Sequence, residues 1–171
     1  MNINSTKSNA SIIGTSDDDF IMSGGFNVTV DADAGNDHIG VLNTVSGSVF
    51  LGWDGDDTIY IEIYAHPSSG SNISINADND NDQISADCSN TIINYGSGDD
   101  SIRSYGTNVT IIGGAGNDTL RILVFSSGDS RNVLLLYKAK RICSLMYALS
   151  ARIVLPLSLT PLRSSIAGSE S

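Results

Sequence analysis

The segment NVTIIGGAGNDTLRI, residues 108–122, contains two short apolar stretches joined by the glycine- and aspartate-rich sequence GGAGND. In each stretch, apolar residues alternate with small or polar ones, which is the period-2 pattern of a half-buried β-strand. One unit is therefore a strand, a tight Gly/Asp turn and a second strand. Two short strands cannot bury their own apolar face, so the segment predicts a repeat.

The same unit occurs five more times upstream. Toward the N-terminus the copies are NTIINYGSGDDSIRS (90–104), NISINADNDNDQISA (72–86), GSVFLGWDGDDTIYI (47–61), NVTVDADAGNDHIGV (27–41) and NASIIGTSDDDFIMS (9–23). The last Asp of each turn forms a column with spacings of 18, 20, 25, 18 and 18 residues: Asp19, Asp37, Asp57, Asp82, Asp100 and Asp118. This repetition predicts an all-β fold, a right-handed parallel β-roll or β-solenoid of about six 18-residue coils. The seven extra residues before the fourth copy fall within 64–72, where Pro and Gly predict a loop that bulges from the stack.

The alternation predicts which side chains form the core. The first strands turn inward Ile12, Val28, Val30, Phe50, Ile73, Ile75, Ile93, Val109 and Ile111, and the second strands turn inward Ile21, Ile39, Val41, Ile59, Ile61, Ile84, Ile102, Leu120 and Ile122. A column of amides precedes the first strands, with one glycine in the series: Asn9, Asn27, Gly47, Asn72, Asn90 and Asn108. Stacked coils would bring these amides together as a hydrogen-bonded ladder.

The charge distribution divides the chain into parts. Residues 1–121 contain seventeen acids and three bases, whereas residues 122–171 contain two acids and six bases, which gives charges of −14 and +4. We expect a lead-in at 1–8, the repeat at 9–122 and a non-repeat tail at 123–171. The net charge of −10 argues against nucleic acid and anionic membrane surfaces as partners.

Three hypotheses remain open for the tail at 123–171, which is expected to be irregular or helical. It could form a basic amphipathic helix near 133–151 that caps the stack, a membrane-surface or secretion segment, or a non-native end such as a frameshifted terminus. Its longest apolar run, 142–159, contains Arg152 and Pro156 and predicts no membrane span. The first 20 residues contain no apolar stretch typical of a secretory signal, and no disulfide is expected between Cys88 and Cys143.

The aspartate column implies a cation. At a coil spacing of about 4.8 Å, neighbouring carboxylates would repel each other by roughly 3–4 kcal/mol per pair at an effective dielectric near 20. Calcium accepts six to eight oxygen ligands in flexible geometry and suits a turn of carbonyls and carboxylates better than magnesium does. The sequence therefore predicts Ca²⁺ as the bound ion.

The sequence GGAGNDTLR, residues 113–121, resembles the nonapeptide of the RTX, or haemolysin-type, calcium-binding repeat family. The resemblance implies a parallel β-roll in which each calcium lies between two stacked loops, bound by loop carbonyls and the final Asp. Carried onto this chain, the carboxylates are those of Asp19, Asp37, Asp57, Asp82, Asp100 and Asp118, and the carbonyls those of Gly14, Gly35, Gly52, Gly55, Gly96, Gly98, Gly113, Gly114 and Gly116. Six loops would form up to about five sites between them.

Two departures from the family pattern bear on these sites. Only one turn per coil contains the Gly/Asp loop, so we expect calcium along one edge rather than two. The loop at 77–82 contains no glycine, and Asp17 stands in the first loop where glycine is expected.

The resemblance implies a calcium-stabilised structural or spacer module of a secreted or cell-surface bacterial protein, such as a fragment of a larger toxin or adhesin exported without an N-terminal signal. Alternatives are a repeat domain attached to an extracellular enzyme (a protease, lipase or polysaccharide-modifying enzyme) and a metal-free β-helix adhesion module whose Asp residues only form turns. We expect no catalytic site in the chain itself, because His38 takes a repeat position and His66 lies in the inserted loop, with no nucleophile and base grouped. A protein or cell-surface partner is left open.

Overall fold

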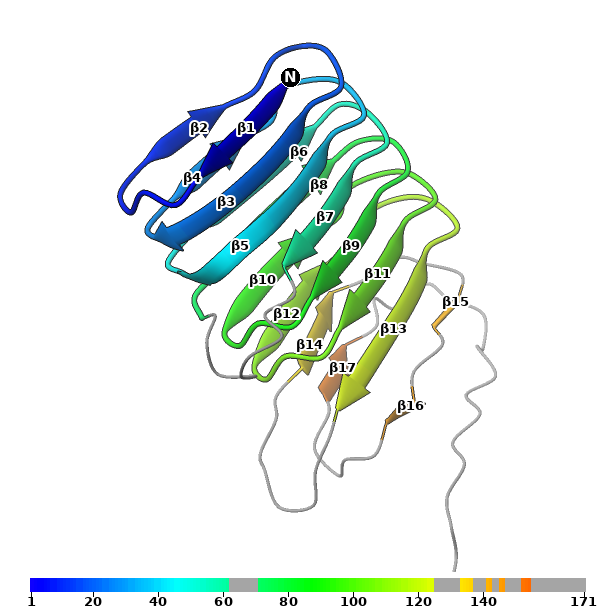
Figure 1. Ribbon diagram of the computed structural model, residues 1–171. Helices are drawn as coiled ribbons and strands as arrows, with labels where there is room; N and C mark the ends of the chain where they lie inside the picture. The colour runs from blue at the N-terminus through cyan, green and yellow to red at the C-terminus, as the bar shows by residue number, and fades with distance from the viewer. Residues whose placement is uncertain (62–70, 125–132, 137–140, 143–144, 147–151, 155–171) are drawn as a thin grey trace, which may run out of the picture.

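The computed structural model describes residues 1–61, 71–124, 133–136, 141–142, 145–146 and 152–154 of the 171-residue chain. These residues form two parallel sheets that face each other (Figure 1). Sheet A contains, in spatial order, β1 (Asn2–Ser5), β3 (Phe20–Phe26), β5 (His38–Ser46), β7 (Thr58–Ile61), β9 (Gln83–Ala86), β11 (Ser101–Ser104), β13 (Thr119–Val124) and β15 (Arg141–Ile142), and β16 (Leu145–Met146) also pairs with β13. Sheet B contains β2 (Ser11–Ile13), β4 (Thr29–Asp31), β6 (Val49–Trp53), β8 (Ser74–Asp78), β10 (Thr91–Asn94), β12 (Val109–Ile112), β14 (Val133–Leu136) and β17 (Arg152–Val154).

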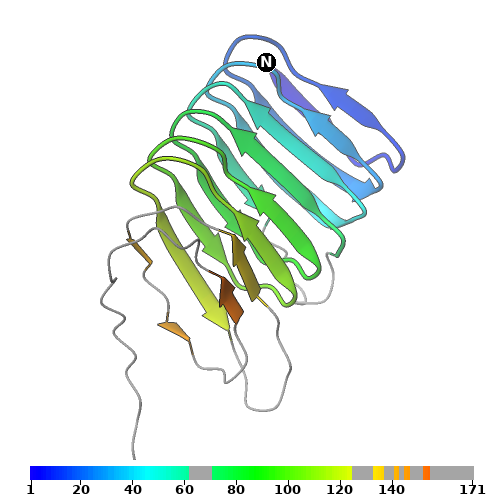
Figure 2. The ribbon, with the colours of Figure 1, turned by 180° about the vertical axis from the view of Figure 1, so that it is seen from behind.

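The chain alternates between the two sheets, so each pair of successive strands is one coil of a β-solenoid. The colours of Figures 1 and 2 run in sequence order along the stack, with sheet A in front in the first view and sheet B in front in the second. This arrangement confirms the predicted parallel solenoid of about six coils with a spacing near 18 residues. Among the described residues, none lies in a helix long and apolar enough to cross a membrane.

The core lies between the sheets and consists of stacked aliphatic columns. In sheet A the pairing places Ile21 beside Ile39 and continues this column to Leu120, and every side chain in it is at most 2% exposed. In sheet B the column runs from Ile12 to Ile111 and includes Phe50. Each fully buried aliphatic side chain contributes about 1.5–3 kcal/mol. The predicted inward residues are confirmed as buried, except that Val41 is half-buried and the side chain of Ile122 lies outside the description.

The asparagine ladder forms at the turns that lead from sheet A to sheet B. The side-chain amide of Asn27 donates to Asn9 Oδ1 over 3.1 Å, and the amide of Asn108 donates to Asn90 Oδ1 over 2.7 Å. The five asparagines of the column have φ between 52° and 57°, and Gly47 has φ 65°. Asn and Gly tolerate this left-handed conformation best. The backbone conformation therefore explains both the column of asparagines and the glycine at position 47.

The two longer repeat intervals are absorbed without loss of register. The pairing of β3 with β5 shifts between Ser23 and Gly25, a bulge that takes up the two extra residues of the 20-residue interval. Beyond the insertion, β6 pairs with β8 and β7 pairs with β9 in the same register as elsewhere. Most of the inserted segment, 62–70, lies outside the described residues.

Parallel strand pairing extends beyond residues 9–122 at both ends. Residues 2–5, expected to be a lead-in, form β1 and pair with β3. The described parts of the tail are strands rather than helix, since β14 pairs with β12 and β17 pairs with β14. Leu134 to Leu136 alternate too little in polarity to be recognised as a strand without the partner strand β12.

Candidate metal centre

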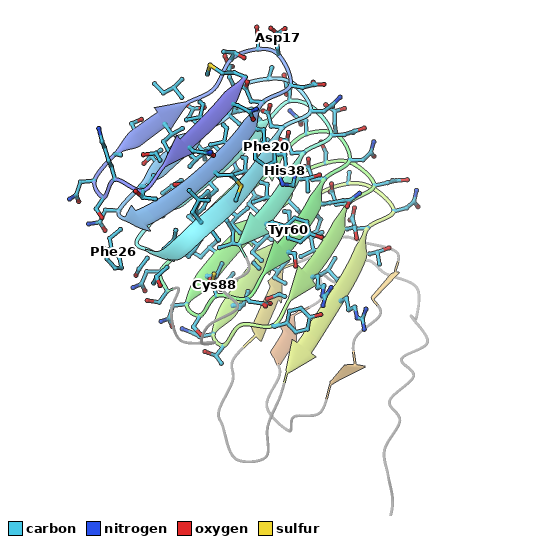
Figure 3. All side chains as sticks on the ribbon, viewed as in Figure 1. Asp17, Phe20, Phe26, His38, Tyr60 and Cys88 are labelled. Carbon is cyan, nitrogen blue, oxygen red and sulfur yellow. The ribbon has the colours of Figure 1, made fainter. Side chains whose placement is uncertain are left out.

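The glycine- and aspartate-rich turns are stacked along one edge of the solenoid, where each chain segment passes from sheet B to sheet A (Figure 1). We number these turns loop 1 to loop 6: residues 14–19, 32–37, 52–57, 77–82, 95–100 and 113–118. Figure 3 labels Asp17 of loop 1 at one end of this edge. Stacking gives each loop position its own column, and the last two positions contain Asp or Asn in every loop.

The inner column is the predicted one: Asp19, Asp37, Asp57, Asp82, Asp100 and Asp118. All six residues are buried, with exposed fractions between 0% and 3%. The backbone N–H of Asp19 donates to Asp37 Oδ1 over 2.8 Å, and the same bond recurs at every step to Asp118 with lengths of 2.8–3.2 Å. One oxygen of each carboxylate from Asp37 onward is therefore used to hold the preceding coil in register.

The second carboxylate oxygen distinguishes the first member of the inner column from the other five. Oδ2 has no hydrogen-bond partner in Asp37, Asp57, Asp82, Asp100 and Asp118, although each atom is buried. In loop 1, by contrast, Asp19 Oδ2 accepts bonds from the N–H and the hydroxyl of Thr15, over 2.6 and 3.1 Å, and its Oδ1 lies against the Met1 ammonium group. A buried carboxylate oxygen without a donor costs free energy, which a bound cation or a proton would offset.

The pKa values of the inner column show the same cost of burying a carboxylate. Burial raises the pKa of Asp37 and Asp100 to about 6, that of Asp57 to about 7 and that of Asp82 to about 8, and neighbouring carboxylates add to the rise. The bond from the Met1 ammonium group instead lowers the pKa of Asp19. Without a cation, the central carboxylates are thus poorly tolerated as anions.

The outer column, one residue earlier in each loop, is exposed and alternates strictly in charge: Asp18, Asn36, Asp56, Asn81, Asp99 and Asn117. The backbone N–H of Asn36 donates to Asp18 Oδ1 over 2.8 Å, and this bond recurs at each step with lengths of 2.7–2.8 Å. The amide of Asn81 also donates to Asp56 Oδ1 over 3.1 Å. No two carboxylates are neighbours in the outer column, so it avoids the repulsion between stacked like charges. The inner column does not avoid it.

Gly14 and Gly52, at the first loop position, have oxygen atoms close to their backbone. A Cβ atom on Gly52 would collide with Asp57 Oδ2 and would lie 3.3 Å from the carbonyl oxygen of Ala77 in loop 4. A Cβ atom on Gly14 would lie 2.7 Å from Asp19 Oδ2 and would collide with the carbonyl oxygen of Ala32 in loop 2. A carboxylate from one loop and a carbonyl from the next are the hard donors that calcium prefers, so the residues present fit this ion.

The remaining predicted glycines shape the backbone of the loops. Left-handed φ values occur at Gly35 (123°), Gly55 (126°), Gly96 (70°), Gly98 (148°) and Gly116 (155°). Loop 4 has no glycine, yet Asp78 and Asp80 adopt the same conformation, with φ of 76° and 71°. The absence of glycine therefore leaves the path of loop 4 intact, because Asp tolerates left-handed φ better than most residues do.

Carbonyl groups are needed to complete any ion site at this edge. Within the described residues, no group of three or more His, Cys, Asp or Glu side chains is close enough to hold a metal ion without other ligands. The inner column supplies one carboxylate per coil, so the loop backbone must provide most of the oxygens. This is the donor set that the Gly/Asp pattern predicts.

Of the two histidines, His38 lies within the described residues. His38 lies on the outer face of sheet A, where its ring stacks on Phe20 at 4.9 Å with an interplanar angle of 4° and lies 6.3 Å from the ring of Tyr60 (Figure 3). The register places it beside Thr58, as expected from its repeat position. His66 lies outside the described residues.

Sequence reasoning missed two features of this edge. The alternation of Asp and Asn in the outer column is visible in the sequence. Its effect on the spacing of charges follows only once the loops are known to stack in register. Tyr95, at the first position of loop 5, is fully buried and its hydroxyl reaches loop 6. The sequence feature that could have identified Tyr95 is a large aromatic residue at a position where the other loops have Gly or Ala.

The Gly/Asp loops along one edge of this parallel β-solenoid are similar to the repeats of a known protein family. The model of the RTX calcium-binding nonapeptide repeat matches the chain in four copies, at residues 13–40 and 94–121. The chain therefore contains RTX calcium-binding repeats, and the matched ranges include loops 1, 2, 5 and 6. No curated protein and no solved structure matches the chain. The repeats support calcium binding in a repeat module of a structural kind.

Proposed function

We propose that the chain is a calcium-dependent structural module in which ions bind between stacked loops along one edge of the solenoid. The carboxylates would come from the inner column, and the carbonyls from the loop backbone, including those of Gly14, Gly35, Gly52, Gly55, Gly96, Gly98, Gly113, Gly114 and Gly116. The observation that carries this proposal is the contrast between the two columns. Charge alternates where solvent is present, yet six buried carboxylates are stacked where an ion would lie.

Calcium would act on folding rather than on a reaction. Binding to the folded loops alone stabilises the fold by about 2.7 kcal/mol per site at a hundredfold excess over the dissociation constant. Dissociation constants near 10⁻⁴–10⁻³ M are typical of extracellular calcium modules. We infer that the module folds fully in a calcium-rich medium, as a spacer in a secreted or cell-surface bacterial protein such as a toxin or adhesin.

The test is thermal unfolding of the full chain, followed by far-UV circular dichroism in EGTA, in calcium and in magnesium. We expect calcium to increase the β-signal and Tm, and magnesium to do so much less. A fold that is complete in EGTA, with a Tm that calcium leaves unchanged, would refute the proposal and favour the metal-free module.

A matched pair of variants assigns the effect to the inner column. Asp57→Asn and Asp56→Asn remove the same charge from adjacent residues, and both keep an Oδ1 acceptor for the inter-coil bond. Asp57→Asn should reduce the calcium-dependent rise in Tm and increase Tm in EGTA, because it removes a buried charge. Asp56→Asn should leave the calcium response unchanged, and an equal response of both variants would contradict the assignment.

A further inference from the structure

The first position of the loops contains a small residue in every case but one. Along the stack it is occupied by Gly14, Ala32, Gly52, Ala77, Tyr95 and Gly113. Tyr95 is 0% exposed and is among the largest fully buried side chains of the described residues. A side chain of this size at the edge where the loops face one another must occupy space that the smaller residues leave open.

The Tyr95 side chain lies between loop 5 and loop 6. It starts from the backbone of loop 5, and a Cβ atom on Gly113 of loop 6 would collide with its hydroxyl oxygen and its ring. At Gly14 and Gly52 the corresponding space is lined instead by a carboxylate oxygen and a carbonyl oxygen. The aromatic ring therefore takes up the volume in which an ion between these two loops would lie.

We propose that Tyr95 closes the space between loops 5 and 6 to calcium, its ring filling the volume in which an ion would lie. This inference rests on the proposed function, and it reduces the possible inter-loop sites by one. Loops 5 and 6 lie within a range that matches the RTX repeat, and Tyr95 is the departure at their interface. Tyr95→Gly changes loop 5 from YGSGDD to GGSGDD and so restores the glycine pattern of loop 6.

The first experiment measures calcium stoichiometry of the full chain by isothermal titration calorimetry and native mass spectrometry. We expect Tyr95→Gly to bind one more calcium ion per chain than the unaltered protein. Phe50→Leu, a change of a buried side chain in β6 and away from the loops, should bind the same number as the unaltered protein. Equal, non-zero stoichiometry in Tyr95→Gly and the unaltered protein would overturn the inference while leaving the proposed function in place.

A second variant tests whether the ring itself closes the space. Tyr95→Phe keeps the ring and should bind the same number of calcium ions as the unaltered protein. An additional ion in Tyr95→Phe would overturn the role of the ring.

These outcomes separate the possible failures. If the unaltered protein binds no calcium, the proposed function fails and the closure of a calcium site fails with it. If it binds calcium and Tyr95→Gly binds no additional ion, only the inference about Tyr95 is refuted.

Discussion

At the scale of single residues, the same side chain has opposite consequences in the two columns of the loop edge. Asp56 is exposed and lies between two asparagines of the outer column, whereas Asp57 is 1% exposed and lies between two carboxylates of the inner column. Water and neighbouring amides can stabilise the first charge, but only a bound cation or proton can stabilise the second. Protons and calcium should therefore compete for the inner column.

This competition predicts how stability depends on pH. The folded-state pKa values of Asp37, Asp57, Asp82 and Asp100 lie at about 6 to 8, above the ordinary value of 3.8. The folded state then binds more protons than the unfolded state, so stability in EGTA is greatest below about pH 4 for these groups and falls as the pH rises to 8. In excess calcium the carboxylates must be ionised to bind, so the calcium-induced rise in Tm should increase over the same range. Thermal unfolding from pH 5 to 8 measures both trends, and a Tm in EGTA that rises with pH would contradict the assignment.

The alternation of Asp and Asn in the outer column should contribute to stability, and a substitution that breaks it tests this contribution. Asn81→Asp would place three successive carboxylates, those of residues 56, 81 and 99, one coil apart, and would remove the amide bond to Asp56. We expect a loss of about 1–2 kcal/mol in EGTA at low salt, which shrinks as salt screens the charges. The double variant Asp56→Asn/Asn81→Asp removes one of the two new repulsions and should recover about half of the loss. Urea unfolding at two salt concentrations measures this, and a loss that is independent of salt would refute the electrostatic cause.

At the scale of the elements, direct hydrogen bonds between backbone groups also hold the loops close together. The N–H of Gly98 in loop 5 donates to the carbonyl of Ala115 in loop 6 over 2.9 Å, and Ser97 bonds the carbonyl of Asp78 in loop 4 over 2.8 Å. Close approach of this kind leaves no room for a Cβ atom at certain positions. Glycine is then required for packing as well as for its φ angle.

Gly98→Ala tests this requirement. The added Cβ would collide with the carbonyl oxygen of Asp80, and φ at Gly98 is 148°. We expect a loss of about 2 kcal/mol or more, in calcium and in EGTA alike, because the clash is within the backbone stack. Ser97→Ala, one residue away, should change stability by no more than about 0.5 kcal/mol. Similar Tm values for the two variants would contradict the structural role of Gly98.

The elements also define how far the sequence alone predicts this molecule. Period-2 alternation gave the buried columns of both sheets, and the spacing of the Asp residues gave the register, because stacked coils make both signals periodic. Residues 2–5 lack the Gly/Asp loop that marks a copy, so β1 could not be recognised without its pairing to β3. The left-handed conformation of Asp78 and Asp80 was likewise hidden, since the stack over-rides the local preference for glycine. Tyr95 was missed because its role depends on a contact with another coil.

At the scale of the whole molecule, stability is expected to be the sum of coils and of the interfaces between them. The described strands pair only with strands of adjacent coils, so a change in one turn alters the interfaces on its two sides. The interval between Asp57 and Asp82 is 25 residues, whereas most intervals are 18, yet the strands on both sides of the insertion pair in register. The described strands thus keep their register across the insertion.

Deletion of residues 63–69 tests whether the whole fold depends on the inserted segment. It removes seven residues and leaves Glu62, Gly70 and Ser71 between Ile61 and Asn72, in the pattern of Tyr105, Gly106 and Thr107 before Asn108. All five intervals of the shortened stack would then be close to 18 residues, and the closure entropy of the turn would change by less than about 1 kcal/mol. We expect the deletion variant to keep its β-signal, its calcium response and a Tm at or above that of the full chain. Removing the same number of residues at 83–89 deletes β9 and should abolish cooperative unfolding. Loss of the calcium response in the 63–69 deletion alone would instead assign the inserted segment a part in ion binding.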